Sequence, residues 1–379
     1  MPYSILAYGK MIGDPVRIDA YVRALTASVR EGDVVLDLGT GVGFFAVLAC
    51  RLGASKVYAI ESDDSIEIAR RVAQINGCAD RIEFIQDLST AITLPDRANV
   101  LISDLRGVLP LFGQHIPSLI DARHRLVTPG GTVMPLRDEI WGTIIDSIAT
   151  YQEKVEPWVN SSSGVDLSPV RHVVANTWSR ERFAEPDFLS APQRIFALDY
   201  ETIGSPNVSA EMSWTCERDG NGHGLGLWFD ATLIPGVGFT NAPGSPEAIY
   251  GNAFFPFDKP IELKRGDTVT VEVAANLVDS EYVWRWNTRA SRNGTSLAEF
   301  RQSTMEAGVL PAAKLRKRRD DYVPTRTEEI RIAEFILHRL DGDSSLGSVA
   351  RILAESYPAR FKNWPAALAH VTKVVEQCT

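Results

Sequence analysis

A glycine-rich turn between an apolar strand and an apolar helix constrains the fold more than any other feature. The segment reads VVLDLGTGVGFFAVLA, with the pattern Asp37-x-Gly39-x-Gly41-x-Gly43. Glycines are required where the backbone turns tightly and a ligand approaches within van der Waals contact. The helix N-terminus behind them favours a negatively charged group. The turn therefore predicts a bound cofactor at the end of a strand.

Strand and helix patterns alternate around this turn. Apolar residues recur at helical spacing in residues 1–30. From residue 33 to 134, predicted strands and helices alternate, with glycines in the turns between them. The predicted strands lie at 34–39, 56–61, 81–86, 99–104 and 130–135, and the predicted helices at 44–53, 65–77 and near 114–126. This alternation is typical of an open parallel α/β sheet with a Rossmann-like fold.

The pattern changes after about residue 140. Strand-like segments with turn residues replace the helical period, which predicts an antiparallel β-barrel or sandwich. These segments lie at 194–203, 225–234, 252–263, 267–277 and 282–290. Residues 159–192 fit neither pattern, and we expect them to form an arm or lid.

A small helical module is expected at the C-terminus. The charge run KLRKRRDD at 314–321 predicts a linker, and three short amphipathic helices follow it. Residues 336–358 are similar to small winged-helix peptide-recognition domains, and a plain three-helix appendage is the alternative. The expected parts are therefore N-terminal helices (1–30), a Rossmann-like domain (31–140), a β-barrel-like domain (141–310) and the helical module (311–379).

Composition and charge exclude several classes of protein. The 379-residue chain has a net charge of −9, so no overall positive field attracts nucleic acid or an anionic membrane. No apolar run approaches the roughly 20 residues of a membrane span, and the N-terminus lacks a signal-peptide core. The four cysteines are far apart and show no metal-ligand spacing. We expect a cytoplasmic protein that binds neither metal nor nucleic acid nor membrane.

Acidic residues at the strand ends point to the cofactor. Glu61 ends the second strand, where a carboxylate can accept hydrogen bonds from two ribose hydroxyls. The stretch from Gly41 to Ala46 also fits a degenerate dinucleotide fingerprint, but that motif leaves Asp37 unexplained. We therefore predict S-adenosylmethionine, with Asp37 on its ammonium side and Gln86 or Asp87 near its adenine. A nucleotide-dependent oxidoreductase and a fold that binds no cofactor are the alternatives.

The N-terminal segment YGKMIGDPVRIDAY, with Met11, Asp14, Arg17 and Tyr21, resembles the signature of the protein arginine methyltransferases. The segments 102–107, 127–135, 183–200 and 245–267 resemble later parts of the same family. The resemblance implies that this helix folds over the cofactor, that Arg17 pairs with its carboxylate, and that Met11 packs near its sulfonium. It also implies a Rossmann-like domain, a β-barrel and a protruding arm that makes a homodimer.

The segment LISDLRGVLPLFG departs from the family at the acceptor site. The family holds the substrate guanidinium between two glutamates; here the first position is Asp104 and the second is Gly113. The Thr-His-Trp triplet of the family reads 248-AIY-250, and Arg106 adds a positive charge beside Asp104. Loss of one partner of a buried charged pair costs about 3–5 kcal/mol, so an arginine side chain should bind poorly.

Three functions follow from these departures. The leading hypothesis is a methyltransferase that acts on an N or O atom of a small molecule or peptide, with Asp104 and His115 as candidate catalytic residues. The second is arginine methylation, of a peptide or of the free amino acid, with a rearranged acid. The third is a non-catalytic regulatory or peptide-binding partner.

Overall fold

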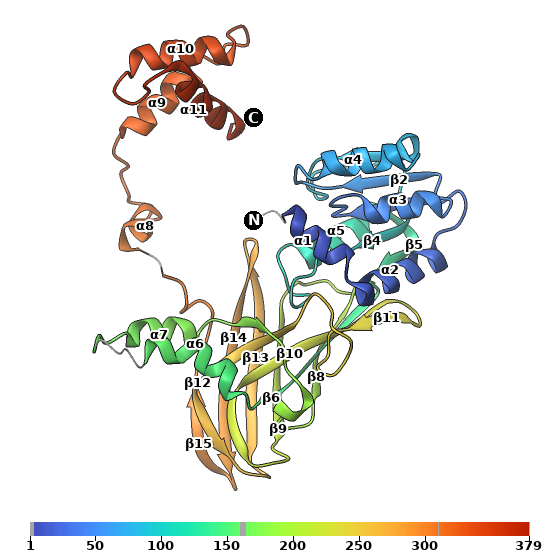
Figure 1. The fold of residues 1–379 in the computed structure, drawn as a ribbon, viewed down its shortest axis with the longest axis vertical. Helices are drawn as coiled ribbons and strands as arrows, with labels where there is room; N and C mark the ends of the chain where they lie inside the picture. The colour runs from blue at the N-terminus through green and yellow to red at the C-terminus, as the bar shows by residue number, and fades with distance from the viewer. Residues whose placement is uncertain (1–3, 160–163, 310, 379) are drawn as a thin grey trace. The chain divides into compact units, whose positions relative to one another are not determined.

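The computed structural model describes residues 4–159, 164–309 and 311–378, and its elements are labelled in Figure 1. The chain divides into two compact units, residues 1–309 and 310–379. The first unit contains a parallel sheet followed by two antiparallel sheets, and the second contains helices. The predicted fold class is confirmed: a Rossmann-like domain, an antiparallel β domain and C-terminal helices.

The five-stranded parallel sheet has the order β3-β2-β1-β4-β5. Its strands are β1 (Val34–Leu38), β2 (Lys56–Ile60), β3 (Ile82–Ile85), β4 (Ala98–Ser103) and β5 (Val127–Met134). The chain order reverses between β1 and β4, which are hydrogen-bonded neighbours. In open α/β sheets, ligands bind outside the carboxyl ends of the strands at such a switch point.

Helices cover both faces of this sheet, as expected for strands that are apolar on both sides. Val35 and Val100 pack with α2 (Pro15–Ser28) and α3 (Phe44–Arg51), whereas Leu36 and Leu101 pack with α5 (His115–Arg125). The helix α4 (Ile66–Ile75) contacts β3 and α3. The carboxyl edge of the sheet therefore lies between helices that can position side chains over it.

The N-terminal helical region is two helices, α1 (Ile5–Ile12) and α2. The break lies at Gly13 and Asp14, because Asp14 caps α2 and Pro15 occupies its first turn. Asp14 Oδ1 accepts a hydrogen bond of 3.2 Å from the backbone N of Arg17. This cap fixes the start of the helix that carries Arg17.

The two antiparallel sheets form the β domain. The first has the order β7-β12-β10-β6-β8 with β11 attached to β10, and the second has the order β15-β14-β13-β9. Buried tryptophans, including Trp214 and Trp286, contribute to the core of these sheets. The bounds are β6 (Arg137–Ile145), β7 (Ser179–Glu181), β8 (Gln193–Asp199), β9 (Val208–Thr215), β10 (Gly220–Ile234), β11 (Val237–Thr240), β12 (Asn252–Leu263), β13 (Thr268–Val278), β14 (Glu281–Arg292) and β15 (Thr295–Phe300).

The segment expected to form an arm differs in extent from the prediction. Its helices are α6 (Ile148–Val155) and α7 (Ser168–Ala175), which lie beside each other in Figure 1. From Ser179 onward the chain returns to the sheet, because β7 pairs with β12. Residues 160–163 of the expected arm lie outside the described residues.

The C-terminal unit contains α8 (Ala312–Lys317), α9 (Glu328–Leu337), α10 (Leu346–Ser356) and α11 (Trp364–Glu376). Ile332, Leu353 and Val371 are fully buried between the last three helices. The three predicted amphipathic helices are thus present, and α8 occupies the start of the expected linker. Within residues 311–378 the structure has no strand.

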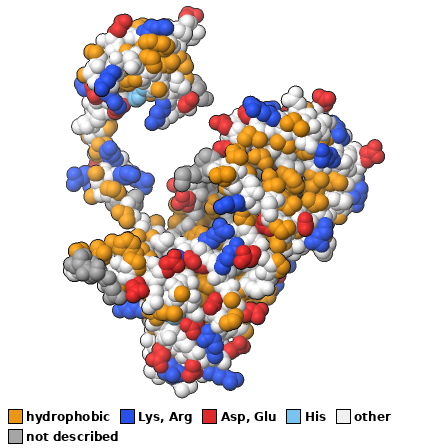
Figure 2. Space-filling view, in the orientation of Figure 1, with side chains coloured by type: hydrophobic (Ala, Val, Ile, Leu, Met, Phe, Trp, Pro, Cys, Tyr) orange, Lys and Arg blue, Asp and Glu red, His pale blue; other side chains and the backbone are white. Residues whose placement is uncertain are grey.

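Among the described residues, no helix combines the length and the apolar character needed to cross a membrane. On the face shown in Figure 2, acidic and basic side chains are interspersed over the first unit, whereas basic side chains gather around α8, which carries Lys314, Arg316 and Lys317.

Candidate active site

A cavity of about 550 Å³ opens at the carboxyl ends of β1, β2 and β4, where the strand order reverses. Its volume lies within the usual range for small-molecule sites. Apolar side chains predominate in its lining, together with a few charged groups. The lining residues are Tyr8, Met11, Ile12, Arg17, Ile18, Gly39, Thr40, Val42, Phe44, Phe45, Glu61, Ser62, Asp63, Leu88, Asp104, Leu105, Phe112, Gly113, Gln114, His115 and Ser118.

The glycine-rich turn forms one wall of the cavity. Gly39, Gly41 and Gly43 all have positive φ angles, of 76°, 55° and 83°. A Cβ atom on Gly39 would lie 2.4 Å from the Leu105 side chain, and one on Gly41 would lie 2.5 Å from the Tyr8 ring. Both the backbone conformation and the close packing therefore require glycine.

Glu61 lies directly after β2 and is held by the backbone on both of its oxygens. Its Oε2 accepts a hydrogen bond of 2.9 Å from Gly41 N, and its Oε1 accepts one of 3.0 Å from Asp63 N. The carboxylate is half-buried and lines the cavity. The structure therefore brings Glu61 to the cavity, and its role toward hydroxyl groups stays a prediction.

Asp37 lies behind the turn and is not among the lining residues. It is buried, and Thr40 Oγ1 donates a hydrogen bond of 2.5 Å to its Oδ2. Burial raises the pKa of Asp37 to about 7. A carboxyl group in this position can act on a ligand through the electrostatic field or through Thr40, which does line the cavity.

Gln86 and Asp87 are exposed and do not line the cavity. Gln86 Nε2 donates to Asp64 Oδ1 at 2.8 Å, and Asp87 Oδ1 accepts from Leu88 N at 2.7 Å. Leu88 lines the cavity instead. The segment after β3 therefore contributes an apolar side chain, that of Leu88, to the cavity.

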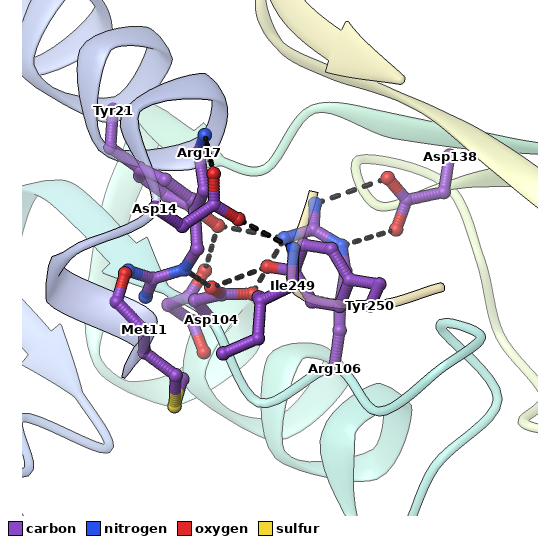
Figure 3. Close-up of polar contacts among 10 residues, drawn as sticks. Met11, Asp14, Arg17, Tyr21, Asp104, Arg106, Asp138, Ile249 and Tyr250 are labelled. Atoms are coloured by element: carbon purple, nitrogen blue, oxygen red, sulfur yellow. Dashed lines mark hydrogen bonds and ion pairs between the residues drawn. The ribbon is translucent and has the colours of Figure 1, made fainter. Parts of the chain in front are cut away.

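Arg17 reaches from α2 to the end of β4. Its Nε donates to Asp104 Oδ2, and its Nη1 donates to the carbonyl oxygen of Met11 at 3.2 Å, as Figure 3 shows. Met11 and Arg17 both line the cavity, as expected. Asp14 Oδ2 accepts a hydrogen bond of 2.7 Å from the backbone N of Ile249, so the β domain holds the start of this helix in place.

Both oxygens of Asp104 are occupied by the chain itself. Besides the contact with Arg17, Oδ2 accepts a hydrogen bond of 2.8 Å from Tyr250 OH, and Oδ1 accepts one of 3.0 Å from Arg106 Nη1. Burial alone would raise the pKa of Asp104, but the two guanidinium groups outweigh it and hold the pKa at about 2. Asp104 is thus a carboxylate whose charge is already neutralised within the protein.

Arg106 is completely buried and turns away from the cavity toward Asp138 on β6. Its Nε lies 2.8 Å from Asp138 Oδ2 and its Nη2 lies 3.1 Å from Oδ1, which is a bidentate ion pair. Its Nη1 also donates to Tyr21 OH at 2.7 Å. The sequence showed the positive charge beside Asp104 but not this partner, which is 32 residues away in the chain.

His115 is the first residue of α5 and is 1% exposed. Its Nε2 lies 3.1 Å from Tyr200 OH, which in turn lies 2.6 Å from Asp138 Oδ2. Burial and the nearby Arg106 lower the pKa of His115 to about 3, so the imidazole is neutral. Gly113 adds no side chain to the cavity and has a φ of 46°.

Two family models match consecutive parts of the chain. Residues 140–290 match "Arginine methyltransferase oligomerization subdomain", and residues 19–134 match "Ribosomal protein L11 methyltransferase (PrmA)". Protein arginine N-methyltransferase 6 of Xenopus laevis is 25% identical over 285 residues, which cover 71% of this chain and 83% of that protein. An arginine N(omega)-methyltransferase of Streptomyces achromogenes is 27% identical over 276 residues, covering 69% and 74%.

Solved structures share the fold. One is the Trypanosoma brucei PRMT1 enzyme-prozyme heterotetrameric complex with AdoHcy, with a TM-score of 0.71 at 20% identity over 78% of this chain and 96% of that chain. Another is Arabidopsis thaliana protein arginine methyltransferase 10, with a TM-score of 0.69 at 22% identity over 79% and 97%. Together these matches support a member of the protein arginine methyltransferase family. The chain is an S-adenosylmethionine-dependent methyltransferase.

The cavity has the chemistry that this cofactor requires. Glu61 brings a carboxylate to the cavity, Arg17 brings a guanidinium, and the thioether of Met11 and the rings of Phe44 and Phe45 bring apolar surface. Within the described residues, no group of three His, Cys, Asp or Glu side chains could hold a metal ion.

Sequence reasoning missed several residues of this family member's site. Tyr8 and Asp63 line the cavity, and Asp63 could have been suspected because it lies two residues after Glu61. Asp138, Tyr200 and Tyr250 come from the β domain. Tyr250 lies in the segment 248-AIY-250 noted above, but the sequence did not indicate its contact with Asp104, and no local pattern marks Asp138. The structure brings six of the predicted residues to the cavity: Met11, Arg17, Gly39, Glu61, Asp104 and His115. The other predicted residues lie outside its lining: Asp37, Gly41, Gly43, Gln86 and Asp87.

Proposed function

We propose that this methyltransferase methylates an oxygen or nitrogen atom of a small molecule or peptide other than an arginine guanidinium. The observation that carries the proposal is the occupation of Asp104 by Arg17, Arg106 and Tyr250. A substrate guanidinium presents five donors and keeps its charge, so it needs free carboxylate oxygens at the site.

The charges around the acceptor end support this proposal. Asp104 is the first of the two acid positions of the family, and Arg106 forms ion pairs with both Asp104 and Asp138. The second acid position is Gly113. A cationic substrate would meet two buried guanidinium groups at Asp104, and this acid is already paired with both, which opposes binding there. A neutral acceptor avoids this repulsion.

For the cofactor, we propose that Arg17 pairs with its carboxylate and that Glu61 accepts hydrogen bonds from its ribose hydroxyls. Gly39, Gly41 and Gly43 allow close approach at the turn, and Met11 packs near the sulfonium. Asp37 favours the ammonium through Thr40 or water. Gln86 and Asp87, expected near the adenine, would reach it only after a change in the loop that carries Leu88.

Incubation of the enzyme with host extract and methyl-labelled S-adenosylmethionine tests the proposal. We expect label in a product that contains no methylarginine, as determined by mass spectrometry after hydrolysis. As a control, the Glu61→Ala variant should give much less of the same product. Label found only in arginine would refute the proposal.

Arginine methylation is the second candidate, because the relatives named above are arginine methyltransferases, one of which acts on the ω-nitrogen. In that case Asp104 would have to exchange its internal partners for the substrate. Robust transfer to free arginine or to an arginine peptide, abolished by Asp104→Ala, would establish this function.

We also propose that the enzyme forms a homodimer. Residues 140–290 match the oligomerization subdomain of the family, and α6 and α7 lie within this range. Ile148 on α6 is 52% exposed, and Val165 just before α7 is 57% exposed. The molar mass measured by light scattering tests the proposal, and a monomer at micromolar concentration would contradict it.

A further inference from the structure

A chain of hydrogen bonds leads from a buried ion pair to the imidazole at the acceptor end of the cavity. It runs from Arg106 through Asp138 and Tyr200 to His115. All four side chains are buried, and they come from the segment after β4, from β6, from the residue after β8 and from the start of α5.

The direction of each hydrogen bond follows from the chemistry of the groups. Asp138 receives Arg106 on both oxygens, so its carboxylate can only accept. Tyr200 has one hydroxyl proton and donates it to Asp138 Oδ2 over 2.6 Å. The hydroxyl oxygen is then the acceptor for His115 Nε2 at 3.1 Å, which places the proton of the neutral imidazole on Nε2.

Nδ1 of His115 therefore carries the lone pair. This atom is buried and has no hydrogen-bond partner within the described residues. A buried polar atom without a partner costs about 1–3 kcal/mol, so its retention needs a reason. His115 lines the cavity together with Met11, Phe112 and Gly113, and a donor group on a bound acceptor would provide the missing partner.

We propose that His115 Nδ1 accepts the proton of the methyl acceptor, and that Tyr200 and Asp138 are positioning residues that fix its tautomer. The acceptor is then a hydroxyl or a weakly basic N–H group. This inference rests on the proposed function, because it requires a neutral acceptor.

The transfer balances with the groups named. The lone pair of the acceptor atom forms a bond to the methyl carbon of the cofactor, the carbon–sulfur bond breaks with its electron pair on sulfur, and the acceptor proton moves to His115 Nδ1. The low pKa of His115, about 3, means that it accepts a proton only from an acidic group. A methylated hydroxyl or amide-like nitrogen is such a group, whereas a methylated alkylamine would keep its proton. The proton then passes to solvent after product release.

The first experiment determines the tautomer without any substrate. Nitrogen-15 spectra of the full-length protein labelled at histidine show which ring nitrogen carries the proton, and the signals of His115 are those that disappear in His115→Gln. We expect the proton on Nε2 at neutral pH, and a mixture of tautomers in Tyr200→Phe. A proton on Nδ1 in the wild-type protein would overturn the proposed proton transfer to this atom.

The second experiment measures the initial rate of label incorporation from methyl-labelled S-adenosylmethionine into the non-arginine product of host extract. His115→Gln keeps a donor toward Tyr200 but removes the Nδ1 acceptor, and we expect a rate about 10²–10⁴-fold lower. The affinity for S-adenosylhomocysteine should not change. His124→Gln, on the exposed side of the same helix, should retain the wild-type rate.

The outcomes separate the two proposals. A wild-type rate in His115→Gln overturns the proposed proton transfer to His115 and leaves the proposed function in place. Label only in arginine overturns the proposed function and with it the assigned acceptor, whatever the tautomer. A lower rate in His115→Gln with unchanged cofactor affinity, together with the Nε2 tautomer, supports both.

Discussion

Replacement of Arg106 by methionine should destabilise the first unit strongly, because it leaves a buried carboxylate without its partner. Asp138 is fully buried and would retain only the hydrogen bond from Tyr200. Removal of one partner of a buried ion pair costs about 3–5 kcal/mol. With an unfolding entropy of about 2.1 cal/mol/K per residue for the 309 residues of this unit, Tm should fall by about 5–8 °C.

Differential scanning calorimetry of the full chain tests this value, and two further variants serve as controls. Arg106→Met/Asp138→Asn removes both charges and should recover more than half of the loss. Arg289→Met breaks an ion pair with Glu211 of 2.7 Å in which both side chains are more than half exposed, and Tm should change by less than about 2 °C. The reasoning is refuted if Arg106→Met lowers Tm no more than Arg289→Met, or if the double variant is no more stable than the single one.

Three other predictions concern ligands. Glu61→Ala should weaken S-adenosylhomocysteine binding about 10–100-fold in calorimetry, because two charge-assisted hydrogen bonds are lost; an unchanged affinity would show that the ribose lies elsewhere. The pKa of Asp37, about 7, means that the unliganded protein holds this proton below neutral pH. A ligand ammonium favours the ionised form, so the affinity should rise by up to about tenfold from pH 6 to pH 8, and Asp37→Asn should be insensitive to pH over this range. Finally, Arg106→Met/Gly113→Glu frees one oxygen of Asp104 and adds an acid at the second position. It should increase the labelling of an arginine peptide from an undetectable level, and no increase in a folded variant would mean that other residues exclude the guanidinium.

The relation between Asp104 and the family acid explains why the two halves of the site differ. The cofactor half keeps the residue types of the family, and these residues line one cavity. In the acceptor half, the acid remains but its oxygens are bound to groups of the same chain. A substrate guanidinium would have to displace buried, hydrogen-bonded cations, whereas a neutral acceptor would not.

The parallel sheet, the glycine-rich turn and the strand-end acid Glu61 were all predictable from the sequence. These features depend on local signals: the alternation of apolar segments, the backbone freedom of glycine and the end of a strand. Because parallel strands end at the same edge of a sheet, local signals on separate strands also predict a common site. The N-terminal motif added Met11 and Arg17 through its likeness to the family.

The contacts of the charged groups at the acceptor site, by contrast, depend on the packing of distant parts of the chain. Arg17 and Asp104 are 87 residues apart, and Tyr250 is 146 residues from Asp104. Arg106 lies two residues from Asp104 in the chain, yet its main partner is Asp138 on another sheet. An unpaired charge in the protein interior costs free energy, so a buried charged side chain pairs with whichever group of opposite charge is packed beside it. The identity of these partners depends on how the β domain packs against the parallel sheet, and no local sequence pattern predicts that packing.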